Sequence, residues 1–192
     1  MKWLDVIKNY IPSCDQEKKD KELILNLSNT YNNLLYRDNE FAHITVSSYI
    51  LNNDKTKVLM IYHNIYNSWS WVGGHADGED DPLKVAIKEG REETGLINLT
   101  PLSDKISSLE ILTVDSHYKN SKYVSPHLHL NLTYFLVANE EDELKIKPDE
   151  NSGVMWIKIE EVKKYSTEPK MIEIYEKLHK KIKNSKWNKE SY

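Results

Sequence analysis

Residues 73–96 limit the possible folds of this chain more than any other segment. The segment reads Gly-Gly-His-Ala-Asp-Gly-Glu-Asp-Asp-Pro-Leu-Lys-Val-Ala-Ile-Lys-Glu-Gly-Arg-Glu-Glu-Thr-Gly-Leu. The paired glycines Gly73 and Gly74 are typical of a tight turn after a strand, and a proline favours the first turn of a helix. Gly95 is well placed as a helix C-cap. The pattern therefore predicts a strand, a glycine turn, an acidic loop and one helix from about Pro82 to Thr94.

The predicted helix has two faces with different chemistry. Its apolar stripe, at spacings of three and four residues, consists of Leu83, Ala86, Ile87 and Gly90. Three carboxylates recur with the same spacing on another face: Glu89, Glu92 and Glu93. Like charges at this spacing destabilise a helix, and the last turn of a helix disfavours anions. The cluster therefore predicts a bound cation, and oxygen ligands suit Mg²⁺ or Mn²⁺ better than Zn²⁺.

A simpler interpretation is a solvated acidic helix end. Lys88 and Arg91 lie on the same helix, and Lys88 can pair with Glu92 four residues later. The flanking glycines favour the metal interpretation, because a glycine turn, an acidic loop and a tri-carboxylate helix together suit a metal-bound diphosphate.

The segment resembles the Nudix box, G-x5-E-x7-R-E-U-x-E-E-x-G-U, in which U is a bulky aliphatic residue. The resemblance runs from Gly74 to Leu96 and matches at Glu89, Glu92, Glu93 and Gly95. Weaker similarity covers roughly residues 41–165, which leaves the first 37 residues outside it. The resemblance implies an α+β fold, a Nudix-type α/β/α sandwich with a mixed sheet.

Three positions depart from the Nudix pattern. Asp80, preceded by Glu79, stands at the first glutamate, Lys88 at the arginine and Gly90 at the bulky aliphatic residue. Lys88 keeps a positive charge without the planar fork of arginine. Gly90 costs about 1 kcal/mol of helix propensity relative to alanine and removes a core side chain. The presumed metal ligands are unaffected.

The resemblance implies a metal-dependent pyrophosphohydrolase that cleaves a nucleoside diphosphate linked to another moiety, with Mg²⁺ or Mn²⁺ as cofactor. Its implied metal ligands are Gly74, through a backbone carbonyl near Gly73 or Gly74, together with Glu89, Glu92 and Glu93. Its implied catalytic residues are Glu92, Glu93, Glu150 and Lys88. The general base stays open among the three glutamates of that list.

Four further residues are candidates for substrate binding: His75, Trp71, His127 and His129. His75 directly follows the glycine pair. His127 and His129 alternate to the same face of a predicted strand, where they contact phosphate or metal, or are hydrogen-bonded residues of a half-buried strand. Trp71, like Trp69 and Tyr66, either stacks on a base or packs in the core.

The remaining chain alternates between helical and strand-like periodicity. Helices are expected at Trp3–Tyr10 and at Pro169–Asn184. A further helix is expected to begin near Asp15, with an apolar stripe that continues to Leu34 and Leu35. Strands are expected at Phe41–Leu51, Val58–Tyr62, Leu109–Val114, His127–Ala138 and Val154–Ile159, the first two as a hairpin. We therefore expect an N-terminal helical extension over residues 1–37 and a Nudix domain over residues 38–192. Residues 117–126 are expected to be a substrate-selecting loop.

Charge and cysteine content exclude several classes of protein. The chain has 26 Lys and Arg against 30 Asp and Glu, a net charge of −4 that disfavours nucleic-acid binding through a positive field. Cys14 is the only cysteine, so no intrachain disulfide forms. No apolar run approaches the roughly 20 residues that cross a bilayer. We expect a cytoplasmic protein with a small nucleotide-diphosphate substrate and no membrane partner, and the N-terminal helices are compatible with a homodimer.

Two alternatives stay open on the same fold. A non-catalytic Nudix domain would bind a nucleotide as a sensor or scaffold, as the three departures allow. An isoprenoid diphosphate isomerase would need a core cysteine, whereas Cys14 lies in the helical N-terminal segment.

Overall fold

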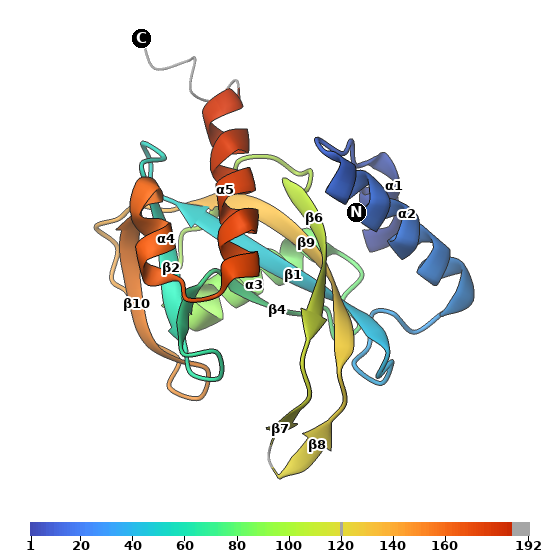
Figure 1. Cartoon of the computed structure of the whole chain (residues 1–192). Helices are drawn as coiled ribbons and strands as arrows, with labels where there is room; N and C mark the ends of the chain where they lie inside the picture. The colour runs from blue at the N-terminus through green and yellow to red at the C-terminus, as the bar shows by residue number, and fades with distance from the viewer. Residues whose placement is uncertain (120, 186–192) are drawn as a thin grey trace. The chain divides into compact units, whose positions relative to one another are not determined.

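The computed structural model describes residues 1–119 and 121–185, which form two compact units. Unit 1 comprises Met1–Ser47, Gly73–Ile87 and Ser103–Tyr134, and unit 2 comprises Ser48–Val72, Lys88–Leu102 and the chain from Phe135 onward. Among the described residues, four elements pass from one unit into the other: β1 (Ala42–Leu51), β4 (Val72–His75), α3 (Pro82–Thr94) and β9 (His127–Val137). The fold is the expected α+β fold with a mixed sheet (Figure 1).

The sheet of unit 1 contains the first halves of β1 and β9, most of β4 (Val72–His75) and β6 (Ser108–Val114). β4 pairs with β1, and β6 pairs antiparallel with β9. β1 and β9 run parallel, because the Leu128 N–H donates to the Phe41 carbonyl and, further along both strands, the Thr45 hydroxyl donates to the Asn131 side chain. β7 (His117–Lys119) and β8 (Lys122–Val124) form a hairpin in the segment expected to be a loop.

The N-terminal helices α1 (Trp3–Asn9) and α2 (Asp15–Thr30) belong to unit 1, where α2 lies along β6 (Figure 1). The Gln16 amide donates to the Leu109 carbonyl at 3.1 Å, and the Asp20 carboxylate accepts the Ile111 N–H at 2.9 Å. Side chains of α2 therefore satisfy backbone groups on the free side of β6, which would otherwise be open to pairing with another strand. The division of the chain into an extension over residues 1–37 and a following domain stays a prediction, and so does a homodimer formed through the N-terminal helices.

The second predicted helix is shorter than expected. α2 ends at Thr30, so Leu34 and Leu35 do not continue its apolar stripe. Instead, Asn33 accepts a turn hydrogen bond from the Tyr36 N–H, and its side chain accepts one from Asn39 at 3.0 Å. The chain therefore turns at Asn33, and Leu34 lies beyond the helix.

Unit 2 contains the predicted β1–β2 hairpin, with β2 at Lys57–His63 and Ile50 opposite Leu59. β10 (Asn151–Lys158) and β3 (Ser68–Ser70) pair antiparallel with β2, and β5 (Thr100–Pro101) pairs with the end of β9. A 3₁₀ turn, η1 (Ile159–Glu161), and the short helix α4 (Val162–Tyr165) precede α5 (Pro169–Asn184). The sequence did not predict β3, β5, η1 or α4, which are all too short to show a period.

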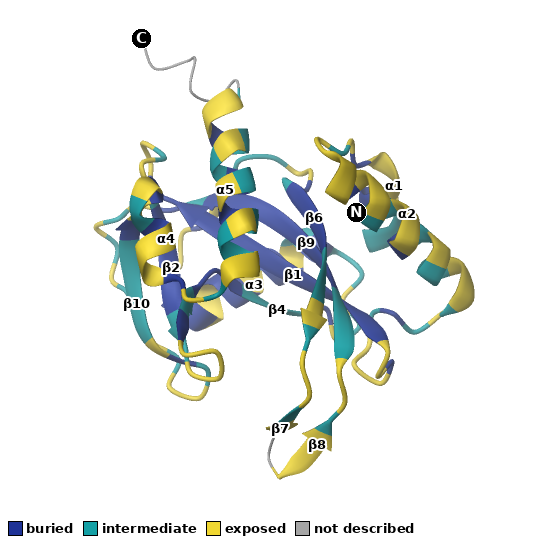
Figure 2. Ribbon diagram, viewed as in Figure 1, coloured by how far each residue is buried: buried dark blue, intermediate teal, exposed yellow. Residues whose placement is uncertain are grey.

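Helix α5 has the predicted bounds and one buried side (Figure 2). Its buried residues are Tyr175, Leu178 and Ile182. In unit 2 the Tyr49 hydroxyl also lies 2.5 Å from His179 Nε2. Burial, with a smaller contribution from the charge of Lys183, lowers the pKa of His179 to about 4.

This histidine predicts a loss of stability in acid. Because the pKa of His179 is lower in the folded than in the unfolded chain, the unfolded chain binds more protons between about pH 6.5 and pH 4. The free energy of unfolding should therefore fall as the pH is lowered from about 6.5 to 4, and His179 should account for up to about 3 kcal/mol of this fall. Urea unfolding at several pH values should show a weaker dependence in His179→Gln, and an unchanged dependence would contradict the assignment.

Candidate functional site

The three glutamates of α3 differ in exposure. Glu89 and Glu93 are buried, with 7% and 4% of their surface exposed, whereas Glu92 is exposed. The apolar side of the helix also differs from the predicted stripe, since Val85, Ala86 and Gly90 are buried and Leu83 and Ile87 are half-buried. Two carboxylates therefore occupy buried positions, where an uncompensated charge is costly.

Two lysines connect these carboxylates within unit 2. Lys88 Nζ lies 3.1 Å from Glu89 Oε1 and 3.6 Å from Glu92 Oε1. Lys147 Nζ lies 3.5 Å from Glu92 Oε2 and 3.0 Å from Glu150 Oε1. Glu150, predicted from a distant part of the chain, thus joins Glu89 and Glu92 through ammonium groups.

The loop before β10 is held against the end of α3 by a buried asparagine. The Asn151 side-chain amide donates to the Glu93 carbonyl oxygen at 3.0 Å, and Asn151 itself is fully buried. A turn in which the Glu150 N–H donates to the Lys147 carbonyl at 2.8 Å then places Glu150 beside Lys147, whose ammonium group reaches Glu92. The sequence analysis missed Lys147, whose only signal was its place three residues before Glu150.

The charges of the cluster shift the pKa values of its members. Burial raises the pKa of Glu89, against the opposing effect of the hydrogen bond from Lys88. For Lys147, burial lowers the pKa, but the hydrogen bond to Glu150 and the charges of Glu150 and Glu92 outweigh it and raise the pKa overall. The hydrogen bond to Glu89 likewise raises the pKa of Lys88. Both lysines are therefore held as cations.

The donor set fits a hard divalent cation. Glu89, Glu92, Glu93 and Glu150 supply carboxylate oxygens, the ligands that Mg²⁺ and Mn²⁺ prefer. The ammonium groups of Lys88 and Lys147 lie against the carboxylates of Glu89, Glu92 and Glu150, so these carboxylates already attract positive charge. Four carboxylates and two ammonium groups leave two formal negative charges, the charge that one divalent ion would neutralise.

Gly73 and Gly74, predicted to form a turn after a strand, lie within strand β4, and the acidic loop that follows belongs to unit 1. At Gly73, a Cβ atom would lie 2.7 Å from the Val46 carbonyl oxygen and 2.8 Å from Ser47 Oγ, so the close approach of β4 to β1 requires glycine. Asp80, at the first glutamate position of the motif, lies 3.7 Å from Lys2 Nζ, and its carbonyl accepts the Trp3 N–H. The predicted ligation by Gly74 stays a prediction.

The predicted substrate-binding histidines come together in unit 1. The ring centroid of His129 lies 5.0 Å from those of His75 and His127. They also gather around His43, which the sequence analysis missed. Its signal was the alternation of polar residues at His43, Thr45 and Ser47 in a strand that is largely apolar apart from Ser48, and all ten residues of β1 are buried.

Trp71 lies elsewhere, in the core of unit 2. It is 8% exposed, its ring packs edge-on against Tyr175 at a centroid distance of 5.6 Å, and its backbone N–H donates to the Tyr175 hydroxyl. This placement matches the core alternative, and Trp71 is not part of the site proposed below.

Comparison with known proteins identifies the family. The family model of the NUDIX domain matches residues 42–178. A "Probable DHNTP pyrophosphohydrolase" of Lactococcus lactis is 26% identical over 137 residues, which cover 71% of this chain and 78% of that protein. No helix in the described ranges, residues 1–119 and 121–185, is both long and apolar enough to cross a membrane.

Solved structures share the fold at low sequence identity. The Ap4A hydrolase of C. elegans in a binary complex has a TM-score of 0.55 at 18% identity, covering 74% of this chain and 98% of that one. The dihydroneopterin triphosphate pyrophosphohydrolase of E. coli has a TM-score of 0.53 at 15% identity, covering 70% and 92%. A Nudix-family hydrolase from Clostridium perfringens has the same TM-score at 21% identity, covering 71% and 95%. The solved structures show the shared fold, and the family model, which matches most of the chain, shows that the protein belongs to the Nudix family of hydrolases that act on phosphoanhydride bonds.

Proposed function

We propose that the protein cleaves a diphosphate bond in a nucleoside diphosphate linked to another moiety, at the carboxylates of unit 2 and with Mg²⁺ or Mn²⁺. The observation that carries this proposal is the convergence of Glu89, Glu92 and Glu150 on two lysines next to the buried Glu93. A divalent ion bound there would neutralise diphosphate oxygens and lower the pKa of a water molecule.

The lysines have a second role in this proposal. Glu89, Glu92 and Glu150 would hold the divalent ion, and its charge would replace that of the ammonium groups of Lys88 and Lys147, which would then be available to the substrate. Both lysines are more exposed than Glu89, and lysine binds phosphate as a mobile point charge. We therefore assign them to the phosphate groups of the substrate.

One carboxylate must accept the proton of the attacking water. Glu92 is exposed and lies between both lysines, Glu150 lies at the edge of the cluster beside Lys147, and Glu93 is buried one residue along the helix. Glu92 combines access to water with a fixed position, which makes it our first choice. Glu93 and Glu150 are the alternatives.

The names of the similar proteins guide the choice of substrates to test. Ap4A and dihydroneopterin triphosphate appear in the names of two of the similar structures, and DHNTP appears in the name of the Lactococcus lactis relative. A panel should contain these compounds, nucleotide sugars, dinucleotides and (d)NTPs, each with Mg²⁺, with Mn²⁺ and with EDTA. We expect turnover of at least one compound that EDTA abolishes, measured by product chromatography.

A non-catalytic nucleotide-binding domain is the second candidate. The departures from the motif favour it, since Asp80 pairs with Lys2 and Lys88 pairs with the presumed ligands Glu89 and Glu92. Calorimetric binding of a panel compound without turnover at either metal would establish this function instead.

A further inference from the structure

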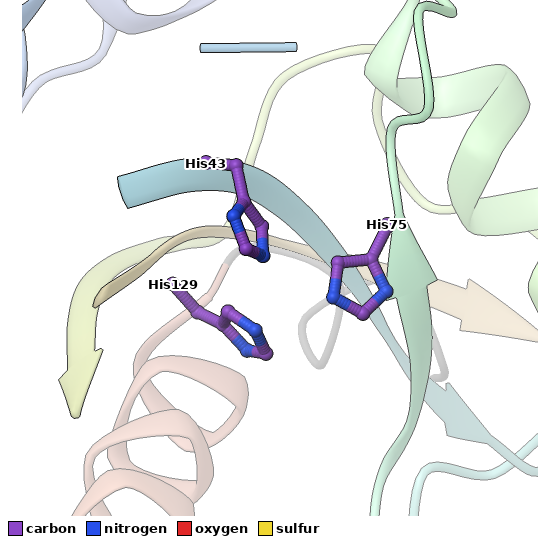
Figure 3. A group of neighbouring side chains, drawn as sticks. All are labelled: His43, His75 and His129. Atoms are coloured by element: carbon purple, nitrogen blue, oxygen red, sulfur yellow. The ribbon is translucent and has the colours of Figure 1, made fainter. Parts of the chain in front are cut away.

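We infer that unit 1 holds a second metal site, in which His43, His75 and His129 bind a first-row transition-metal ion such as Zn²⁺. The three residues come from three adjacent strands, β1, β4 and β9, and their rings point towards one another (Figure 3). The site goes beyond the proposed function, because it uses imidazole nitrogens in unit 1 and none of the carboxylates.

Strand pairing explains the convergence. β1 lies between β4 and β9, with the Ala76 N–H donating to the Ile44 carbonyl on one side and the Leu128 N–H donating to the Phe41 carbonyl on the other. These contacts bring the residues next to them, His75 and His129, alongside His43. All three pairs of ring centroids are 5.0 Å apart.

The distances are close to those of a metal site. One ligand nitrogen from each of the three histidines lies within 4.8 Å of the other two. In a tetrahedral Zn²⁺ site with Zn–N bonds of about 2.0–2.1 Å, the nitrogens are roughly 3.3 Å apart. Small side-chain rotations would close this difference. Three histidines with an open fourth position are an established ligand set for Zn²⁺.

His43 supplies an independent indication of a ligand. It is 4% exposed, and its Nδ1 lies 3.1 Å from the Asn39 carbonyl oxygen. A carbonyl only accepts, so Nδ1 carries the proton and Nε2 has a free lone pair. This Nε2 is buried and has no hydrogen-bond partner within residues 1–119 and 121–185, although burying an unpaired polar atom is costly. A metal ion would remove this cost, and the Asn39 carbonyl would fix the ring orientation, as backbone carbonyls do for metal-bound histidines.

Hydrogen bonding favours a metal cation over a phosphate. Because His43 Nδ1 faces the Asn39 carbonyl oxygen, the buried Nε2 offers an electron pair, which a metal ion accepts, whereas an anion would need an N–H donor at that position. His127 also lies in this environment, with Nε2 3.2 Å from His129 Nε2 and Nδ1 2.8 Å from the Ser125 carbonyl oxygen, and it positions the His129 ring.

The ligand type separates this site from that of unit 2. Carboxylate oxygens suit Mg²⁺ and Mn²⁺, while imidazoles suit Zn²⁺, Cu²⁺, Fe²⁺ and Ni²⁺. The two sites should therefore bind different ions in the same protein, and each can be removed without touching the ligands of the other.

The test measures metal content and affinity rather than catalysis. The full chain is stripped with a chelator, loaded with Zn²⁺, dialysed and analysed by mass spectrometry, with Co²⁺ absorption reporting nitrogen coordination. We expect one Zn²⁺ per chain in the wild type, in the control His63→Ala, whose histidine lies in unit 2, and in Glu92→Gln. His75→Ala and His129→Asn should bind at least about 100-fold more weakly.

Other results would overturn the inference. The first is a wild type that retains no Zn²⁺. The second is Zn²⁺ that is lost in Glu92→Gln but kept in His75→Ala and His129→Asn, which would place the ion at the carboxylates. Calorimetric binding of inorganic phosphate that depends on His129, without Zn²⁺ binding, would make the cluster an anion subsite. Circular dichroism of the metal-free variants checks the fold, and both replaced residues, His75 and His129, are only half-buried, which limits the cost of either replacement. Because no substrate is used, a failure here is distinct from a failure of the proposed hydrolysis.

Discussion

Glu92→Gln and Glu93→Gln should each lose Mg²⁺-dependent cleavage, with kcat lower by about 10²–10⁴-fold, the range for removal of a general base. Glutamine keeps the size of the side chain but removes the charge that both binds a cation and accepts a proton. In Glu92→Gln the ion pairs of Lys88 and Lys147 with this position are also lost. Product chromatography on the best compound of the substrate panel, over a range of Mg²⁺ concentrations, provides the measurement.

The matched control is Glu176→Gln on α5, which removes one exposed carboxylate outside the cluster and should leave kcat unchanged. A loss in kcat that high Mg²⁺ restores would show that Glu92 acts mainly as a metal ligand rather than as the base. Full activity in both cluster variants would contradict the proposed site, and cleavage would then have to occur elsewhere in the chain.

Gly90→Leu, which restores the bulky aliphatic residue of the Nudix pattern, should destabilise the protein by about 1–3 kcal/mol through overpacking. A Cβ at this position would lie 2.6 Å from Leu99 Cδ1 and 3.6 Å from Ile50 Cδ1, so Leu99 already fills the space. Leu99→Ala alone should cost about 2–5 kcal/mol by leaving a cavity, because Leu99 is buried.

The double variant, Gly90→Leu with Leu99→Ala, tests this compensation. With the Leu99 side chain truncated, the leucine introduced on the helix can occupy its volume. The double variant should therefore be more stable than the sum of the two single effects predicts, by at least about 0.5 kcal/mol. Urea unfolding of the four proteins, compared by midpoint at constant slope, gives the coupling free energy. If the two changes in the free energy of unfolding were strictly additive, the Leu99 side chain would not be filling the space left by Gly90.

Local elements with a clear period were predictable from the sequence. α3 has its predicted bounds, and Gly95 has the positive φ of 76° that a helix C-cap favours, with its N–H donating to the Arg91 carbonyl. The β1–β2 hairpin formed at the predicted turn, where the Asn52 side chain accepts the N–H groups of Thr56 and Lys57. Each of these features depends on residues close together in the chain, so spacing alone identifies it.

Predictions that needed a long-range contact were weaker. The paired strands at residues 117–119 and 122–124 were expected to be a loop, because strands of three residues are too short to show alternation. The second helix was predicted past its end, since the apolar spacing continues to Leu34 although the chain turns at Asn33. Leu34 is buried nonetheless, so its apolar character reports burial and not helical structure.

For the functional chemistry, the sequence by itself identified the family and the carboxylates on one helix, and it predicted a hard divalent cation, because these follow from residue types at fixed helical spacing. Only the tertiary structure showed that Lys147 connects Glu92 with Glu150, and that His43 meets His75 and His129. These residues are separated by tens of positions and meet through strand pairing and a buried asparagine anchor. Spacing along one helix is a local property, whereas the meeting of separate strands depends on every pairing register between them.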